Sequence, residues 1–120
     1  MKRFMLALAS AILASVMSVG YAADLAAGKA VFYKFNCASC HGADGRTAVD
    51  PLYPILAGQH ADYLRHTLKA YQRGAAGSAA TANVRTNPVM SALVGQLSDE
   101  DIEQVAAWLA AQPSELGVRQ

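Results

Sequence analysis

The chain has 120 residues, of which 53% are hydrophobic, and its ten basic side chains nearly balance nine acidic ones. This length allows one small domain. The formal net charge of +1 excludes the strongly basic composition that is typical of nucleic-acid-binding proteins. Two cysteines, Cys37 and Cys40, are too few for a framework of several disulfide bridges.

The first 22 residues have the pattern of a secretory signal peptide. Lys2 and Arg3 supply a positive start, an apolar run covers 4–19, and Gly20 and Ala22 are the small residues at the two positions that signal peptidase inspects. We predict cleavage after Ala22. Loss of the two basic residues would change the formal net charge from +1 to −1.

Cleavage would leave one domain, residues 23–120, in the periplasm. The alternative is an uncleaved membrane anchor, although the apolar run is short of the about 20 residues that a membrane-spanning helix needs. We therefore expect no stable membrane insertion after cleavage.

A first helix is predicted from about Leu25 to Asn36, with Asp24 as its N-cap. Gly28 and Phe32 are four positions apart and so share one face of this helix. Because glycine costs a helix about 1 kcal/mol relative to alanine, Gly28 indicates the close approach of another element.

The next stretch, Cys37-Ala38-Ser39-Cys40-His41, has the attachment pattern of a c-type haem. Two thiols three positions apart can form thioethers with the two vinyl groups of one porphyrin, and His41 can then ligate the iron. A thioredoxin-like pair would need a βαβ setting, and a structural zinc site would need further ligands at suitable spacing. The sequence offers neither. The motif together with an exported chain therefore predicts one covalently bound haem c.

The rest of the chain predicts further helices and no convincing strand. An extended loop over 50–58 is followed by a helix from about Gln59 to Arg73 that Gly74 ends. After a small, polar loop over 75–86, a short helix is expected from about Val89 to Val94. Ser98-Asp99-Glu100-Asp101 is typical of a capping box and opens a last helix to about Gln112. The predicted fold class is all-α.

Met90 is the favoured sixth ligand of the iron. It is the single methionine of 23–120, and a thioether ligand suits an electron carrier because it raises the reduction potential. A lone methionine can also be core filler. His60 and His66 are rival ligands, but their helix positions favour the surface, and a pentacoordinate haem is the remaining alternative. For the second ring nitrogen of His41, a backbone carbonyl of the loop around Pro54 is a candidate acceptor, unless this proline only shapes the loop.

These features together resemble a class I c-type cytochrome, close to small bacterial monohaem members and to single domains of di-haem periplasmic cytochromes c. The matching segments are Gly28-x-x-x-Phe32, Cys37-x-x-Cys40-His41, the stretch 53–59, Asn87-Pro88-Val89-Met90, and 97–102 leading to Trp108. The resemblance implies four to five short helices around one haem, with the N- and C-terminal helices crossing where Gly28 and Phe32 meet Trp108. It also implies His41 and Met90 as axial ligands and the Pro54 carbonyl as acceptor from His41. Trp108 stands where the family commonly has tyrosine, and the single motif implies a single haem.

The expected function is periplasmic electron transfer, because an iron with both axial positions filled has no vacancy for a substrate. Partners would be redox proteins such as a quinol-oxidising complex, a terminal oxidase or reductase, or a dehydrogenase. An alternative is a cytochrome subunit of a periplasmic dehydrogenase or sulfur-oxidising complex. A haem sensor or a peroxidase-like enzyme is a third class, and it would require an open iron site.

Overall fold

The computed structural model describes residues 25–116. The predicted signal peptide over 1–22 and the predicted cap Asp24 lie outside this range. Within it the chain forms the N-terminal helix at 25–34 and helices separated by loops, with no strand. The prediction of an all-α fold is therefore confirmed. The helices are α2 (Ala38–His41), α3 (Ala61–Ala75), the 3-10 turn η1 (Ala80–Ala82), α4 (Pro88–Val94) and α5 (Asp99–Ala110).

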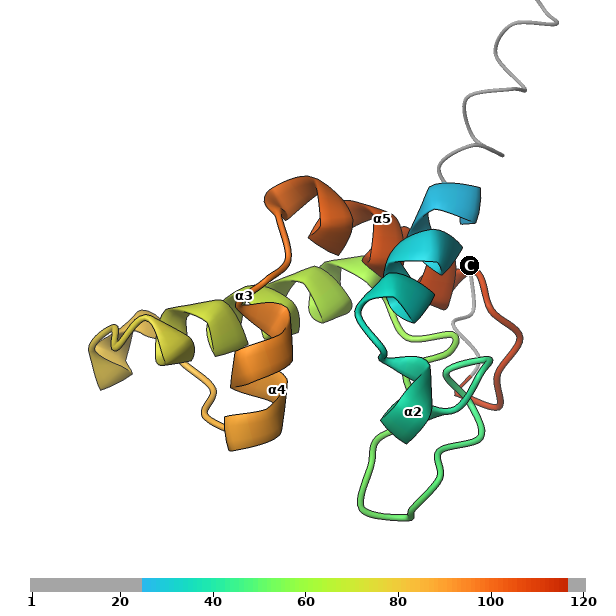
Figure 1. The fold of residues 1–120 in the computed structure, drawn as a ribbon, viewed down its shortest axis with the longest axis horizontal. Helices are drawn as coiled ribbons and strands as arrows, with labels where there is room; N and C mark the ends of the chain where they lie inside the picture. The colour runs from blue at the N-terminus through green and yellow to red at the C-terminus, as the bar shows by residue number, and fades with distance from the viewer. Residues whose placement is uncertain (1–24, 117–120) are drawn as a thin grey trace, which may run out of the picture.

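The N-terminal helix lies against α5, as Figure 1 shows. A Cβ atom built on Gly28 would lie 2.1 Å from the main-chain oxygen of Gln104 and 2.6 Å from the Cβ of Trp108, so only glycine allows this approach. One turn later the rings of Phe32 and Trp108 pack with centroids 5.0 Å apart. The predicted crossing of the terminal helices at these residues is confirmed.

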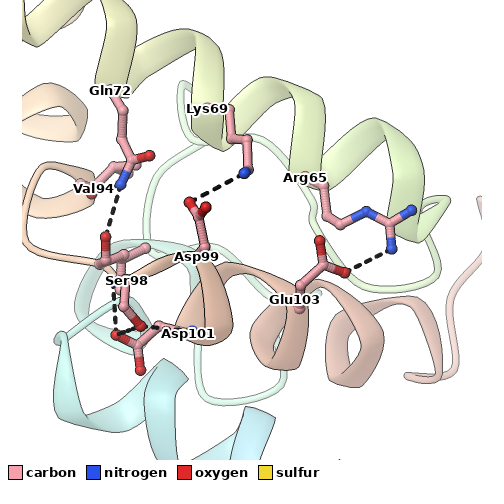
Figure 2. A network of polar contacts seen from close by, with 9 residues as sticks. Arg65, Lys69, Gln72, Val94, Ser98, Asp99, Asp101 and Glu103 are labelled. Atoms are coloured by element: carbon pink, nitrogen blue, oxygen red, sulfur yellow. Dashed lines mark hydrogen bonds and ion pairs between the residues drawn. The ribbon is translucent and has the colours of Figure 1, made fainter.

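Helix α3 lies beside α5 and carries the other side of the core. Buried Leu64 belongs to the same apolar cluster as Ile102, Val105 and Leu109 of α5. Polar contacts fix the two helices around this cluster, as Figure 2 shows. Arg65 pairs with Glu103 at 2.9 Å and Lys69 pairs with Asp99 at 3.1 Å. Such largely exposed ion pairs stabilise by at most about 1 kcal/mol each, so they contribute little to the strength of this packing.

The amide of Gln72 ties α3 to the connection between α4 and α5. Its Nε2 donates to the carbonyl oxygens of Val94 (3.1 Å) and Leu97 (2.8 Å). Directly after this connection, Ser98 and Asp101 form the predicted capping box, with the Asp101 amide donating to Ser98 Oγ and the Ser98 amide donating to the Asp101 carboxylate. This prediction is confirmed.

Helix boundaries differ from the predictions by one or two residues: the N-terminal helix ends at 34 and not at Asn36, α5 ends at Ala110 and not at Gln112, and α3 and α4 differ as follows. Helix α3 runs from Ala61 to Ala75 and not from Gln59 to Arg73, so Gly74 lies inside the helix and does not end it. A Cβ atom on Gly74 would lie 2.1 Å from the carbonyl oxygen of Arg85, so this glycine serves a close chain approach. Helix α4 begins one residue early, at Pro88, because Asn87 caps it through its side chain.

Candidate functional site

The two cysteines and His41 lie on a single helical turn. The chain leaves the N-terminal helix through a tight turn in which Asn36 has a positive φ of 59°, and Cys37 then opens α2. The His41 amide donates to the Cys37 carbonyl at 3.0 Å. Positions three apart on such a turn share one face, so Cys37 and Cys40 occupy positions suited to two bonds with one planar group.

Both thiols are free and half-buried. The pKa of the Cys37 thiol is raised, mainly because the group is partly buried. The thiol therefore stays protonated at neutral pH. Among residues 25–116, no cluster of three or more His, Cys, Asp or Glu side chains could hold a metal ion.

His41 is the one buried polar or charged side chain among the described residues, with 5% of its surface exposed. Its Nδ1 lies 3.0 Å from the carbonyl oxygen of Pro54. A carbonyl can only accept, so Nδ1 carries the proton and donates it in this bond. In the neutral imidazole Nε2 then keeps a lone pair, and this is the form that binds a metal.

The loop after the motif is held so that it reaches His41. Val49 donates its amide to the Cys40 carbonyl at 3.1 Å, and the amides of Leu56 and Ala57 donate to the Gly45 carbonyl at 2.8 and 3.0 Å. These bonds hold both ends of the segment that carries Pro54. The carbonyl of Pro54 is thereby fixed in front of the imidazole.

Met90 lies in the first turn of α4. The side chain of Asn87 accepts hydrogen bonds from the amides of Val89 and Met90, at 3.0 Å each, and this fixes the backbone that carries Met90. Its side chain is half-buried and packs against the edge of the core. Met90 on α4 and His41 on α2 therefore come from two different helices. Both helices lie below the level of α3 in the view of Figure 1.

The two rival histidines lie elsewhere. His60 is exposed at the N-cap of α3 and makes no side-chain capping bond. His66 is also exposed, and its Nδ1 lies 2.7 Å from the Asp62 carbonyl oxygen of its own helix.

Large apolar side chains lie exposed on the segments around the motif and Met90. They are between 40% and 88% exposed, and they are Val49, Leu52, Tyr53, Ile55, Tyr63 and Val89. A contiguous apolar patch made of such side chains is typical of a binding site. Covering it with another apolar group would contribute about 25 cal/mol per Å².

A haem c fits this set of residues. The free thiols of Cys37 and Cys40 share one turn, and the buried imidazole of His41 donates through Nδ1, which leaves Nε2 for a metal. The exposed apolar side chains are available to cover a porphyrin. Sequence reasoning missed the apolar set and the Asn87 cap. The signal for both was present, in bulky residues between Pro51 and Pro54 and in an Asn-Pro pair ahead of a helix.

Comparison with known proteins agrees with this fit. Residues 25–112 match the family model described as Cytochrome c. A cytochrome c6 from Picosynechococcus sp. is 42% identical over 114 residues, which cover 90% of this chain and 92% of that protein. A cytochrome c-554(548) from Halomonas halodenitrificans is 40% identical over 79 residues, covering 64% of this chain and 84% of that protein.

A longer relative matches over only part of its length. A protein from Stutzerimonas stutzeri named thiosulfate dehydrogenase electron acceptor is 40% identical over 78 residues, which are 65% of this chain but 32% of that protein.

None of the helices between residues 25 and 116 is both long enough and apolar enough to cross a membrane.

Proposed function

Because the chain belongs to the cytochrome c family, we propose that it is a periplasmic electron carrier with one covalently attached haem c and His41/Met90 axial ligation. The family and its relatives support electron transfer by a c-type cytochrome. The ligand pair, the compartment and the absence of enzymatic activity are our proposal.

The observation that carries the proposal is the His41–Pro54 hydrogen bond beside two free thiols on one turn. When bound, haem c supplies an iron that cycles between the ferric and ferrous states. The residues of the chain do the rest. Cys37 and Cys40 would attach the ring, the Pro54 carbonyl would orient the imidazole of His41, and His41 and the Met90 thioether would hold the iron, with the thioether favouring the ferrous state.

The proposed compartment depends on the first 22 residues. Their pattern favours export and removal of the leader, which places haem attachment and electron transfer in the periplasm. The carrier would meet its donor and acceptor, a quinol-oxidising complex and a terminal oxidase or reductase, through small transient interfaces.

An absorption spectrum recorded with a redox titration tests the proposal. We expect covalent haem that survives denaturation, a weak red band from the thioether ligand of ferric iron, and a single one-electron transition. Ready binding of carbon monoxide by the ferrous protein at neutral pH would contradict the Met90 assignment and would favour a sensor or peroxidase-like protein with an open site.

A second candidate function is a dedicated electron-accepting subunit of a periplasmic dehydrogenase. The similarity to the thiosulfate dehydrogenase electron acceptor favours it. Purification from the native source separates the two functions. A free carrier elutes alone, whereas a subunit elutes in a stoichiometric complex with its dehydrogenase.

A further inference from the structure

Gln72 of α3 places both N–H groups of its side-chain amide on main-chain carbonyls at the end of α4 and just beyond it. Its Nε2 lies 3.1 Å from the carbonyl oxygen of Val94 and 2.8 Å from that of Leu97. A carbonyl oxygen can only accept, so the nitrogen end of the amide faces both of them and its two donors are fully used. The side chain is half-buried, and Figure 2 shows it pointing from α3 toward Val94.

The segment that these bonds hold, residues 87–97, makes its other hydrogen bonds within itself. Asn87 caps α4 through its own side chain, the main-chain amides that follow α4 donate back to carbonyls of α4, and the Gln96 side chain donates to the Ala92 carbonyl. Within residues 25–116, the hydrogen bonds that join this segment to another helix are therefore those from Gln72. Val94 also packs in the core, but apolar packing is non-directional, so the two bonds are the directional contacts that place the end of α4.

Met90 lies one helical turn before Val94. Helix α4 spans only Pro88–Val94, which is about two turns, so it moves as one unit. Residues four apart share one face of a helix, and accordingly Val94 is buried in the core while Met90 packs half-buried against the same apolar cluster. A displacement of the end of α4 would therefore displace Met90 as well.

We propose that Gln72 is a positioning residue for the Met90 thioether. This inference rests on the proposed His41/Met90 ligation, and it assigns to Gln72 the role of keeping α4 where Met90 can stay on the iron. Without the two bonds the end of α4 is released from α3, and conformations in which the thioether has left the iron become more populated. An added ligand then competes with Met90 more easily.

The test uses three substitutions of Gln72 in the holoprotein. Gln72→Leu removes the amide, Gln72→Glu keeps the shape but turns acceptors toward the two carbonyls, and Gln72→Lys keeps N–H donors on a longer side chain. Gln96→Leu is the matched control for the change of residue, because the Gln96 amide bonds back to α4 itself. Gly28→Ala is the control for lost stability, because Gly28 lies at the crossing of the terminal helices and not at α4.

The readouts are the dissociation constant of imidazole for the ferric protein and the rate of amide hydrogen exchange in residues 88–97. Imidazole competes with the thioether, so its affinity reports how often Met90 leaves the iron. We expect Gln72→Leu and Gln72→Glu to bind imidazole about tenfold more tightly, as the loss of two hydrogen bonds allows, and to exchange the amides of α4 faster. Gln72→Lys should stay close to the parent in both readouts.

Gln96→Leu should match the parent, and Gly28→Ala should lower the free energy of unfolding without tightening imidazole binding. The inference is wrong if Gln72→Leu and Gln72→Glu bind imidazole as the parent does. It is also wrong if Gly28→Ala tightens binding as much as they do, since the effect then follows overall stability. Should Gln72→Leu yield no holoprotein, Gln72→Glu decides the same question, because it preserves the shape of the side chain.

The red thioether band of the parent keeps the two proposals apart. A parent without this band refutes Met90 ligation, and the role of Gln72 with it. A parent that has the band, together with Gln72 variants that bind imidazole as the parent does, refutes the role of Gln72 alone.

Discussion

The Nδ1 of His41 donates to the Pro54 carbonyl across 3.0 Å, and this bond joins the motif turn to a loop thirteen residues further along the chain. Donation from Nδ1 fixes the ring plane and makes Nε2 a better ligand. Because the acceptor belongs to a main chain that is bonded at both ends, the orientation of the imidazole is set by the fold.

Loss of the second thiol should impair attachment of the haem. Cys40→Ala leaves one thiol on the α2 turn, so we expect holoprotein yield to fall severalfold, with any haem held through Cys37 alone. The haem content of purified protein, measured after denaturation, checks this. Ser39→Ala is the control, because it keeps both thiols and removes only an exposed hydroxyl that bonds to the Asn36 carbonyl at 2.8 Å and to the Cys40 thiol at 3.8 Å. Equal haem content in the two variants would contradict the assignment of Cys40.

Removal of the Met90 thioether should open the iron without releasing the haem. In Met90→Ala we expect the weak red band to vanish, carbon monoxide to bind the ferrous protein, and the reduction potential to fall, because a soft thioether favours ferrous iron. Val89→Ala alters the neighbouring side chain, which is 58% exposed, and should keep the red band. A Met90→Ala protein with the parental spectrum and potential would show that another residue is the ligand.

The fold was predictable from sequence where a local pattern coincided with a packing requirement. Gly28 and Phe32 stand one turn apart, which predicted the close approach of another element, and the resemblance to class I c-type cytochromes implied the crossing with Trp108 that the structure contains. Helix α2 was not predicted, since a four-residue turn is too short to show periodicity. The end of α3 was predicted wrongly, because glycine usually breaks a helix, whereas Gly74 admits the main chain of Arg85.

For the candidate site, the sequence could point to the residues that we propose carry the chemistry but not to what surrounds them. The motif identified His41, whereas the fixed loop and the Gln72 bonds to Val94 and Leu97 depend on chain segments that meet only after folding. Exposure of Leu52 and Val89 is likewise a property of the folded chain, since sequence alone reads such residues as core.

A side chain at Gly28 should separate the two terminal helices. The Cβ of Gly28→Ala would lie 2.1 Å from the Gln104 carbonyl oxygen, and overpacking of this kind costs about 1–3 kcal/mol. This exceeds the about 1 kcal/mol that alanine gains over glycine in a helix. Chemical denaturation of the holoprotein checks whether Gly28→Ala lowers the free energy of unfolding. Lys29→Ala, an exposed change on the same helix, should alter the free energy of unfolding by less than about 0.5 kcal/mol. A Gly28→Ala protein as stable as the parent would contradict the close approach.

The capping box of α5 should make part of the stability dependent on acid pH. Hydrogen bonds from the Ser98 amide and hydroxyl lower the pKa of the Asp101 carboxyl below its ordinary value. A carboxyl whose pKa is lower in the folded state stabilises the fold above its unfolded pKa of about 3.9, and this contribution is lost as the pH falls through the folded pKa. We expect Ser98→Ala to cost about 1 kcal/mol at neutral pH and to reduce the decline in unfolding free energy below about pH 4. Denaturation of both proteins between neutral pH and pH 3 measures this, and parallel curves would contradict the role of the Ser98 hydroxyl in lowering the Asp101 pKa, since the Ser98 amide is kept in the variant.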